Sequence, residues 1–180
     1  MTGAPCVKLG LTGSIAMGKS TTAQMFRDAG IPVWDADATV HRLYQSGQPG
    51  AEAIRALAPD TIVDGAVDRG RLSAAIQAKP ELLGQIEAAI HPLVAADRTR
   101  FTEEIRGDIL LFDIPLLFET GGDATLDAIV VVTAPESVQT ARALARPGMT
   151  PEKLTAIRAR QMPDAEKRAR ADFLIDTSEG

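Results

Sequence analysis

Short apolar runs alternate along the chain with longer stretches in which apolar residues recur at helical spacing. The runs are rich in valine, isoleucine and leucine and end near glycine, proline or aspartate, which predicts buried strands. These predicted strands are residues 7–12, 31–34, 109–112, 128–132 and 173–175. Residues 19–29 form an amphipathic helix that Gly30 ends. Strands that alternate with helices indicate an α/β fold, an open parallel five-stranded sheet with helices on both faces.

Prolines divide the remaining stretches, which we expect to be helical. Residues 40–44 and most of 48–101 are predicted to be helix, and later helices open at Pro135 and near Glu152. The stretch between the second and third strands is long for a simple crossover, so we interpret about 48–105 as an insertion that covers a substrate. We therefore expect a single domain over residues 1–180, with that insertion and a lid at about 142–162.

Composition and charge exclude several classes of protein. The 180 residues are 45% apolar and 24% charged, which is ordinary for a globular fold and too apolar for a disordered chain. We expect no membrane segment and no export signal, and the single Cys6 fits the reducing cytoplasm. A net charge of −5 argues against general nucleic-acid binding. Eight of the nineteen basic residues lie between Arg142 and Arg170, either as a solvated helical face or as a phosphate-facing patch.

The first predicted strand leads into a complete phosphate-binding loop. Residues 13–20, Gly-Ser-Ile-Ala-Met-Gly-Lys-Ser, match the pattern G-x-x-x-x-G-K-[ST] between a buried strand and an amphipathic helix. The backbone N–H groups of such a loop surround phosphate oxygens at the positive end of the helix. We expect ATP to be bound by Gly13, Ser14, Ile15, Ala16, Met17, Gly18, Lys19, Ser20 and Thr21. The pattern predicts a P-loop kinase fold, with Lys19 meeting the charge of the transferred phosphoryl group.

Acidic residues follow two of the other predicted strands. Asp113 ends the strand 109–112 and can hold Mg²⁺, directly or through water, together with the hydroxyl of Ser20. Asp35 and Asp37 follow the strand 31–34, at the edge of the sheet where ligands bind. One of the two could accept a proton from a hydroxyl and the other could cap the next helix. Alternatively, Asp113 only caps a helix or a loop.

Two arginines are predicted to share one face of the helix that opens at Pro135. Arg142 and Arg146 are four residues apart, and Pro147-Gly148 follows as a hinge. Arginines on a closing lid would neutralise charge that develops during phosphoryl transfer. A solvated pair of arginines is the alternative.

At this point the chain resembles the dephospho-coenzyme A kinases, and the resemblance covers nearly its whole length. Besides the phosphate loop, separate segments match in the order that this family has. They are Asp35-Ala36-Asp37 with His41, Asp68-Arg69 with Leu72, His91-Pro92 with Val94, Pro115-Leu116-Leu117-Phe118-Glu119, and then Arg142, Arg146, Gly148, Gln161 and Ala171-Asp172.

The resemblance implies that ATP phosphorylates the 3′-hydroxyl of dephospho-coenzyme A, with Mg²⁺ as the metal. It implies that Asp37 is the base, that Lys19 and Arg146 are catalytic, and that Arg142 binds the nucleotide. His91, Leu117 and Glu119 would bind the coenzyme A part of the substrate. Without the resemblance, His91 before Pro92 reads as a helix-boundary residue, and Leu117 reads as core.

The chain departs from the family pattern at two places. Ser14, Ala16 and Met17 stand where the family commonly has glycine, glycine and serine. Gly13 and Gly18 remain, so the loop should function if Ala16 can adopt its backbone angles without a positive φ. The family often has asparagine near Thr177, where it contacts adenine, and this chain contains no asparagine.

Other nucleotide-binding proteins are the alternatives. Another small-molecule kinase, such as a nucleoside monophosphate or shikimate kinase, shares the loop but not the later segments. A GTP-dependent switch would need an [NT]-K-x-D motif, which none of the lysines provides.

Overall fold

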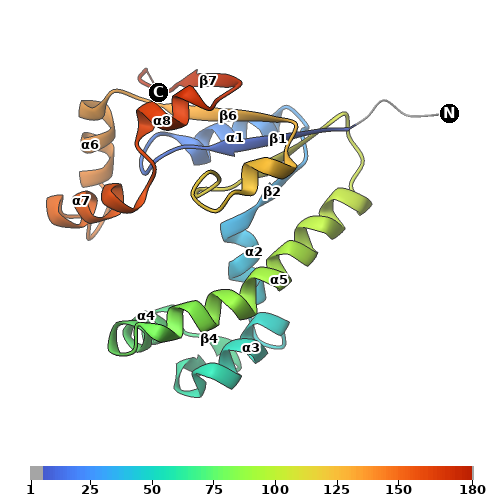
Figure 1. Cartoon of the computed structure of the whole chain (residues 1–180), viewed down its shortest axis with the longest axis vertical. Coiled ribbons are helices and arrows are strands. Elements are labelled where there is room, and N and C mark those ends of the chain that lie inside the picture. Colours follow the sequence, from blue (N-terminus) through green and yellow to red (C-terminus); the bar gives the residue numbers. More distant parts are fainter. Residues whose placement is uncertain (1–5, 180) are drawn as a thin grey trace. The chain divides into compact units, whose positions relative to one another are not determined.

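The computed structural model describes residues 6–179, and its contacts divide the chain into two compact units (Figure 1). The sheet unit comprises Met1–Trp34 and Arg106–Gly180, and the helical unit comprises Asp35–Ile105. The helical unit thus begins at Asp35, before the insertion expected at about 48–105. No helix within residues 6–179 is long and apolar enough to cross a membrane.

A five-stranded sheet organises the sheet unit, in the order β2-β5-β1-β6-β7. The strands are β1 (Val7–Thr12), β2 (Val33–Asp35), β5 (Ile109–Asp113), β6 (Ala128–Thr133) and β7 (Phe173–Asp176). Central β1 pairs in parallel with both β5 and β6, and β6 pairs in parallel with β7. The predicted parallel sheet is confirmed, with strand ends that differ by up to two residues.

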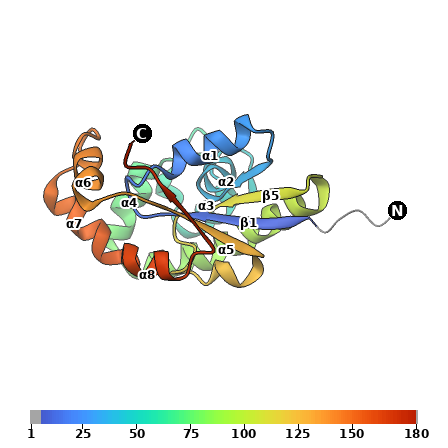
Figure 2. The same cartoon turned by 90° about the horizontal axis from the view of Figure 1, so that it is seen from above.

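Helices cover both faces of this sheet, as Figure 2 shows for α1 and α8. The helices of the sheet unit are α1 (Lys19–Asp28), α6 (Glu136–Leu144), α7 (Pro151–Arg160) and α8 (Asp164–Ala169), with the short 3₁₀ turn η2 (Gly122–Thr125). Helix α8 was not predicted, because residues 164–169 are too short and too charged to present a helical apolar pattern.

Strand β6 explains why both faces of the sheet are buried. Val130 and Val132 point into the cluster that also contains Leu11 and Ala23, whereas Ile129 and Val131 pack with Leu117 and Phe118. Successive side chains of a strand point to opposite faces, so an unbroken apolar run fills a core on each side. Strands buried in this way hold their carboxyl ends, where the phosphate loop begins, in fixed positions.

The helical unit has its own core. It contains α2 (Ala36–Leu43), α3 (Pro49–Leu57), η1 (Pro59–Thr61), α4 (Arg69–Ala78), α5 (Glu81–Glu104) and a hairpin of β3 (Ile62–Val63) and β4 (Ala66–Val67). The prediction that Pro92 marks a helix boundary is wrong, because α5 continues through it. Leu82, Ile86 and Ile90 of α5 are buried in this core with Ile54 of α3. Burial of this face stabilises the helix despite the hydrogen bond that proline removes.

Candidate active site

The phosphate loop between β1 and α1 depends on glycine at two positions. A Cβ atom on Gly13 would lie 2.3 Å from Cγ2 of Val132, so the loop approaches β6 too closely for any side chain. Gly18 has a φ of 88°, in the left-handed region that glycine adopts without strain. The two glycines that the motif requires therefore have separate structural reasons, close packing at Gly13 and backbone conformation at Gly18.

The N-terminus of α1 is suited to binding an anion. Gly18 is its N-cap and has no side chain to accept a hydrogen bond, and the first turn contains no acidic residue. The first N–H groups of a helix have no acceptor within the helix, and the helix dipole adds positive potential there. A loop with left-handed residues beside such an end forms a concavity for anions. These features fit the phosphates of a nucleotide.

Lys19 and Asp113 lie together at the carboxyl edge of the sheet. The ammonium of Lys19 donates to Oδ1 of Asp113 at 2.5 Å, and the carboxylate is 4% exposed. Strands β1 and β5 place them, because Asp113 pairs with Leu11 just before the loop. The hydroxyl of Ser20 on the exposed first turn of α1 and the carboxylate of Asp113 are oxygen ligands of the kind Mg²⁺ prefers.

The donor set fits a magnesium ion held mainly by phosphate and water. No group of three or more histidine, cysteine or acidic side chains within residues 6–179 could hold a metal by itself. Magnesium usually binds through one or two protein oxygens and keeps several waters. Ser20 and Asp113 together are sufficient for this mode of binding.

Thr177 links the end of β7 to the phosphate loop. Its hydroxyl donates to the carbonyl of Met17 at 2.8 Å and accepts from the guanidinium of Arg142 at 3.0 Å. Arg142 also donates to the carbonyl of Thr177 at 2.6 Å. Thr177, near which the family often has asparagine, therefore holds the phosphate loop of this chain in place. In this structure Arg142 is fixed by that contact, whereas Arg146 is exposed.

Ala16 does adopt a positive φ angle. Its φ is 61°, and its side chain is buried against Ala143 and Leu154. A left-handed alanine costs roughly 1–2 kcal/mol. Burial of the methyl group offsets part of that cost, since a buried CH₂ contributes about 0.8 kcal/mol.

Substitution of Ala16 should separate strain from packing. Ala16→Val should lower stability by roughly 1–3 kcal/mol, because a β-branched residue is strongly disfavoured at this angle, and should weaken ATP binding. Ala16→Gly should be near neutral, because relief of strain opposes the loss of the methyl group. Thermal unfolding and ATP calorimetry measure both effects. Equal behaviour of the two variants would contradict this account.

The Pro115–Glu119 segment lies behind the loop in the sheet unit. Leu117 has no exposed surface and packs with Phe118, Ile129 and Val131. Glu119 accepts the backbone N–H of Met162 at 2.8 Å and forms an ion pair with the fully buried Lys167 at 3.0 Å. Both side chains, expected to bind substrate, are thus engaged by the protein.

Glu119 should make stability depend on pH in the acid range. Burial raises its pKa, but hydrogen bonds from the Met162 N–H and from Lys167 outweigh it, so the pKa lies below its ordinary 4.5. A lowered folded-state pKa stabilises the fold above the ordinary value, and this stability is lost as the pH falls through the folded pKa. Glu119→Gln should therefore cost roughly 3 kcal/mol at neutral pH, the cost of an unpaired buried lysine.

The difference between the wild type and Glu119→Gln should shrink as the pH falls below about 4. Denaturant unfolding at a series of pH values measures it. Glu87→Gln, on exposed α5 surface, is the charge-matched control. A difference that stays constant down to pH 3 would show that the carboxylate charge is not what stabilises the fold.

Three residues expected on the acceptor side belong to the helical unit. Asp35 is the N-cap of α2 and accepts the backbone N–H of Ala38 at 2.9 Å, so the cap predicted for one of the two aspartates is confirmed. Asp37 lies exposed in the first turn of α2, and His91 lies exposed on α5. The structure thus leaves the carboxylate of Asp37 and the ring of His91 accessible.

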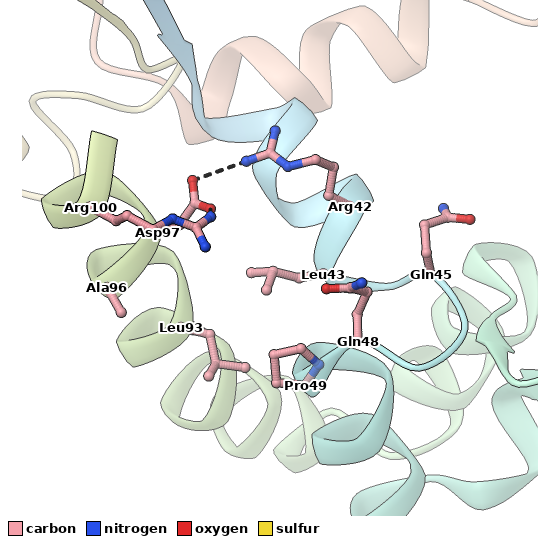
Figure 3. Close-up of a pocket in the computed structure, with 9 residues that line it drawn as sticks. All are labelled: Arg42, Leu43, Gln45, Gln48, Pro49, Leu93, Ala96, Asp97 and Arg100. Atoms are coloured by element: carbon pink, nitrogen blue, oxygen red, sulfur yellow. Dashed lines mark hydrogen bonds and ion pairs between the residues drawn. The ribbon is translucent and has the colours of Figure 1, made fainter. Parts of the chain in front are cut away.

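The helical unit also contains a surface pocket, between the α2–α3 connection and α5 (Figure 3). Its volume is about 520 Å³. The guanidinium of Arg42 lies 3.0 Å from the Asp97 carboxylate at one side, and Leu43, Pro49 and Leu93 supply apolar surface. No residue predicted for the site lines this pocket.

Two glutamines that contact the loop were not assigned a role from sequence. Gln161 accepts the N–H of Ile15 at 3.0 Å, and Gln139 donates to the Ile15 carbonyl at 2.9 Å. Gln161 is part of the family resemblance, but no local pattern gives either residue a function. Both are more than 100 residues away from the loop in sequence, so only the fold reveals these contacts.

Comparisons with known proteins identify the family of the chain. A family model described as dephospho-CoA kinase matches residues 7–180. A dephospho-CoA kinase of Ruegeria pomeroyi is 56% identical over 94% of this chain and 86% of its own length, and one of Mesorhizobium japonicum is 55% identical over 97% and 89%.

Solved structures show the same fold. A protein from Thermus thermophilus has a TM-score of 0.86 at 33% identity, covering 97% of this chain and 90% of that one. A shikimate kinase from Acinetobacter baumannii in complex with shikimate has a TM-score of 0.57 at 16% identity, covering 98% and 86%, and so supports the fold alone. The match of the family model over residues 7–180 and the identities above 50% show that the chain belongs to the dephospho-CoA kinase family.

Proposed function

We propose that this chain transfers the γ-phosphoryl group of ATP to the 3′-hydroxyl of dephospho-coenzyme A, giving coenzyme A and ADP. The observation that carries the proposal is the complete phosphate loop, with Lys19 paired to Asp113, in a chain of this family. The alternative function is that of another small-molecule kinase. Relatives that are more than 50% identical over most of the chain do not favour it.

The phosphates of ATP would be held by the loop and the start of α1. Backbone N–H groups of the loop and of the first turn of α1 would surround the β- and γ-phosphates, and Lys19 would balance charge on the transferred group. Ser20 and Asp113 would hold Mg²⁺, which supplies neutralisation of the phosphate charge when bound. Lys19 would exchange part of its contact with Asp113 for phosphate oxygen.

Groups of the helical unit and of the predicted lid would act on the acceptor and on the charge of the transition state. Asp37 would orient the 3′-hydroxyl and accept its proton, and His91 would bind the coenzyme A part. Arg146, which is exposed, is the arginine free to meet the developing charge, and Arg142 would bind nucleotide from its position beside Thr177. We assign Leu117 and Glu119 to support of the site rather than to direct contact.

A coupled assay of ADP release tests the function. Purified protein with ATP and Mg²⁺ should release ADP when dephospho-coenzyme A is added, and much less with shikimate, a nucleoside monophosphate or gluconate. Mass spectrometry should find one phosphoryl group added at the 3′ position. Faster turnover with any of the other acceptors would reject the proposal. We also propose a cytoplasmic location, which cell fractionation would test.

A further inference from the structure

Both backbone polar groups of Ile15 in the phosphate loop are held by glutamine side chains. The N–H of Ile15 donates to Oε1 of Gln161 at 3.0 Å, and its carbonyl accepts from Nε2 of Gln139 at 2.9 Å. Gln139 belongs to α6 and is 5% exposed, and Gln161 directly follows α7. The two helices lie side by side in both views of the chain (Figures 1 and 2).

Arg158 fixes the orientation of the Gln139 amide. Its guanidinium donates to Oε1 of Gln139 at 2.6 Å and to the hydroxyl of Thr140 at 2.8 Å. Arginine can only donate, so the amide oxygen must face Arg158 and the NH₂ group must face the carbonyl of Ile15. The contact with the loop is therefore a donor–acceptor pair whose direction the surroundings determine.

Glu119, at the end of the Pro115–Glu119 segment, holds the residue that follows Gln161. The next residue, Met162, donates its backbone N–H to Glu119 at 2.8 Å, and Glu119 is in turn paired with the buried Lys167. A continuous series of contacts thus runs from Lys167 through Glu119 and Met162 to Gln161 and the loop. This series connects Glu119 to the phosphate loop through protein contacts alone.

The residue that follows Ile15 is the strained Ala16, with a φ of 61°. A residue in such a conformation persists only where its surroundings over-determine it. The two glutamines fix the peptide groups on one side of Ala16, and Ala143 and Leu154 pack against its methyl group. On the other side, Thr177 holds the carbonyl of Met17.

We propose that Gln139 and Gln161 are positioning residues that hold the phosphate loop of this chain, with its strained Ala16, in its nucleotide-binding conformation. Their effect on nucleotide affinity is independent of the acceptor, and only the effect on turnover rests on the proposed function. Loss of either contact lets the loop relax away from the arrangement that binds phosphate. Nucleotide affinity then falls, whereas the affinity of the acceptor changes little.

Matched substitutions separate the hydrogen bonds from charge and from packing. Gln161→Glu keeps an oxygen that accepts the Ile15 N–H, and Gln161→Met removes it. Gln139→Glu and Gln139→Met both remove the donor to the Ile15 carbonyl. The two glutamate variants add the same charge near the loop, so Gln161→Glu, which keeps its hydrogen bond, is the charge control for Gln139→Glu. Gln77→Met, on the exposed surface of α4, is the control for a harmless change.

The measurement is calorimetry of a non-hydrolysable ATP analogue with Mg²⁺ and no acceptor. The Kd should rise roughly 3–10-fold in Gln161→Met, Gln139→Met and Gln139→Glu, as expected for one lost hydrogen bond. Gln161→Glu should stay within about 2-fold of the wild type, and Gln77→Met should be unchanged. Adding Ala16→Gly to Gln161→Met should recover much of the lost affinity, because glycine needs no external support at this φ angle.

Other patterns would overturn the proposal. Equal weakening of Gln161→Glu and Gln139→Glu would mean that added charge decides affinity. A lower melting temperature with an unchanged Kd in both methionine variants would leave the glutamines only a structural role. If the wild type binds the analogue but does not phosphorylate dephospho-coenzyme A, the proposed function fails while the binding comparison still decides this inference.

Discussion

Lys19→Ala should abolish phosphoryl transfer to dephospho-coenzyme A while the protein stays folded. The ammonium lies beside Asp113 at the phosphate loop. We propose that it meets the charge developing on the transferred phosphoryl group. Removal of one such stabilising group typically costs roughly 10²–10³-fold in kcat. The ADP-release assay gives the turnover, and circular dichroism with thermal unfolding establishes that the variant is folded.

The ion pair with Asp113 requires a second variant. Lys19→Ala leaves a carboxylate that is 4% exposed without its lysine, so some loss of stability is expected. Lys19→Ala with Asp113→Asn removes that charge and should recover stability without recovering turnover. Lys79→Ala, an exposed lysine after α4, should behave as the wild type. Near wild-type turnover in folded Lys19→Ala would mean that the loop is not the ATP site.

The parts of the fold that follow from local pattern were predicted correctly. Strands β5 and β6 are continuous apolar runs because both faces of the sheet are buried there, as the alternating packing of β6 illustrates. The phosphate loop needs glycine for close packing at Gly13 and for backbone conformation at Gly18, so these two residues identify it in the sequence. The predicted family is confirmed by comparison, and the segments that carried the prediction are spread over the chain.

The elements that were not predicted either lack such a pattern or lie where another pattern dominates. Strands β3 and β4 are two residues each, and the Asp64-Gly65 turn between them, with both φ angles positive, was the available signal. Helical spacing dominates the surrounding stretch, so this turn did not lead to a predicted hairpin. Pro92 suggested a boundary, but tertiary burial of Ile86 and Ile90 stabilises α5 across it.

The supporting residues of the site could not be predicted, because tertiary contacts define them. Glu119 was expected to bind substrate, yet it is paired with a lysine 48 positions later that the fold buries completely. Gln139 and Gln161 converge on Ile15 only after α6 and α7 pack beside the loop. A polar residue whose partner is distant in sequence leaves no local periodicity to detect.

Asp35 and Asp37 should give opposite results on substitution, although only one residue separates them. Asp35 accepts the N–H of Ala38 as the N-cap of α2. Asparagine caps helices as well as aspartate does, so Asp35→Asn should keep both stability and turnover. Asp35→Ala should lose about 1 kcal/mol of stability, which denaturant unfolding measures.

Asp37→Asn should lower kcat by roughly 10²–10⁴-fold, because the amide keeps the shape of the carboxylate but cannot accept a proton. The loss should lie at the lower end if orientation of the hydroxyl matters more than proton removal, since phosphoryl transfer has a loose transition state. ATP affinity should change little, because residues 13–20 hold the phosphates. Turnover and ATP calorimetry on the variants of both residues give the comparison. Active Asp37→Asn with inactive Asp35→Asn would reverse the two roles, and full activity of both would remove this segment from the mechanism.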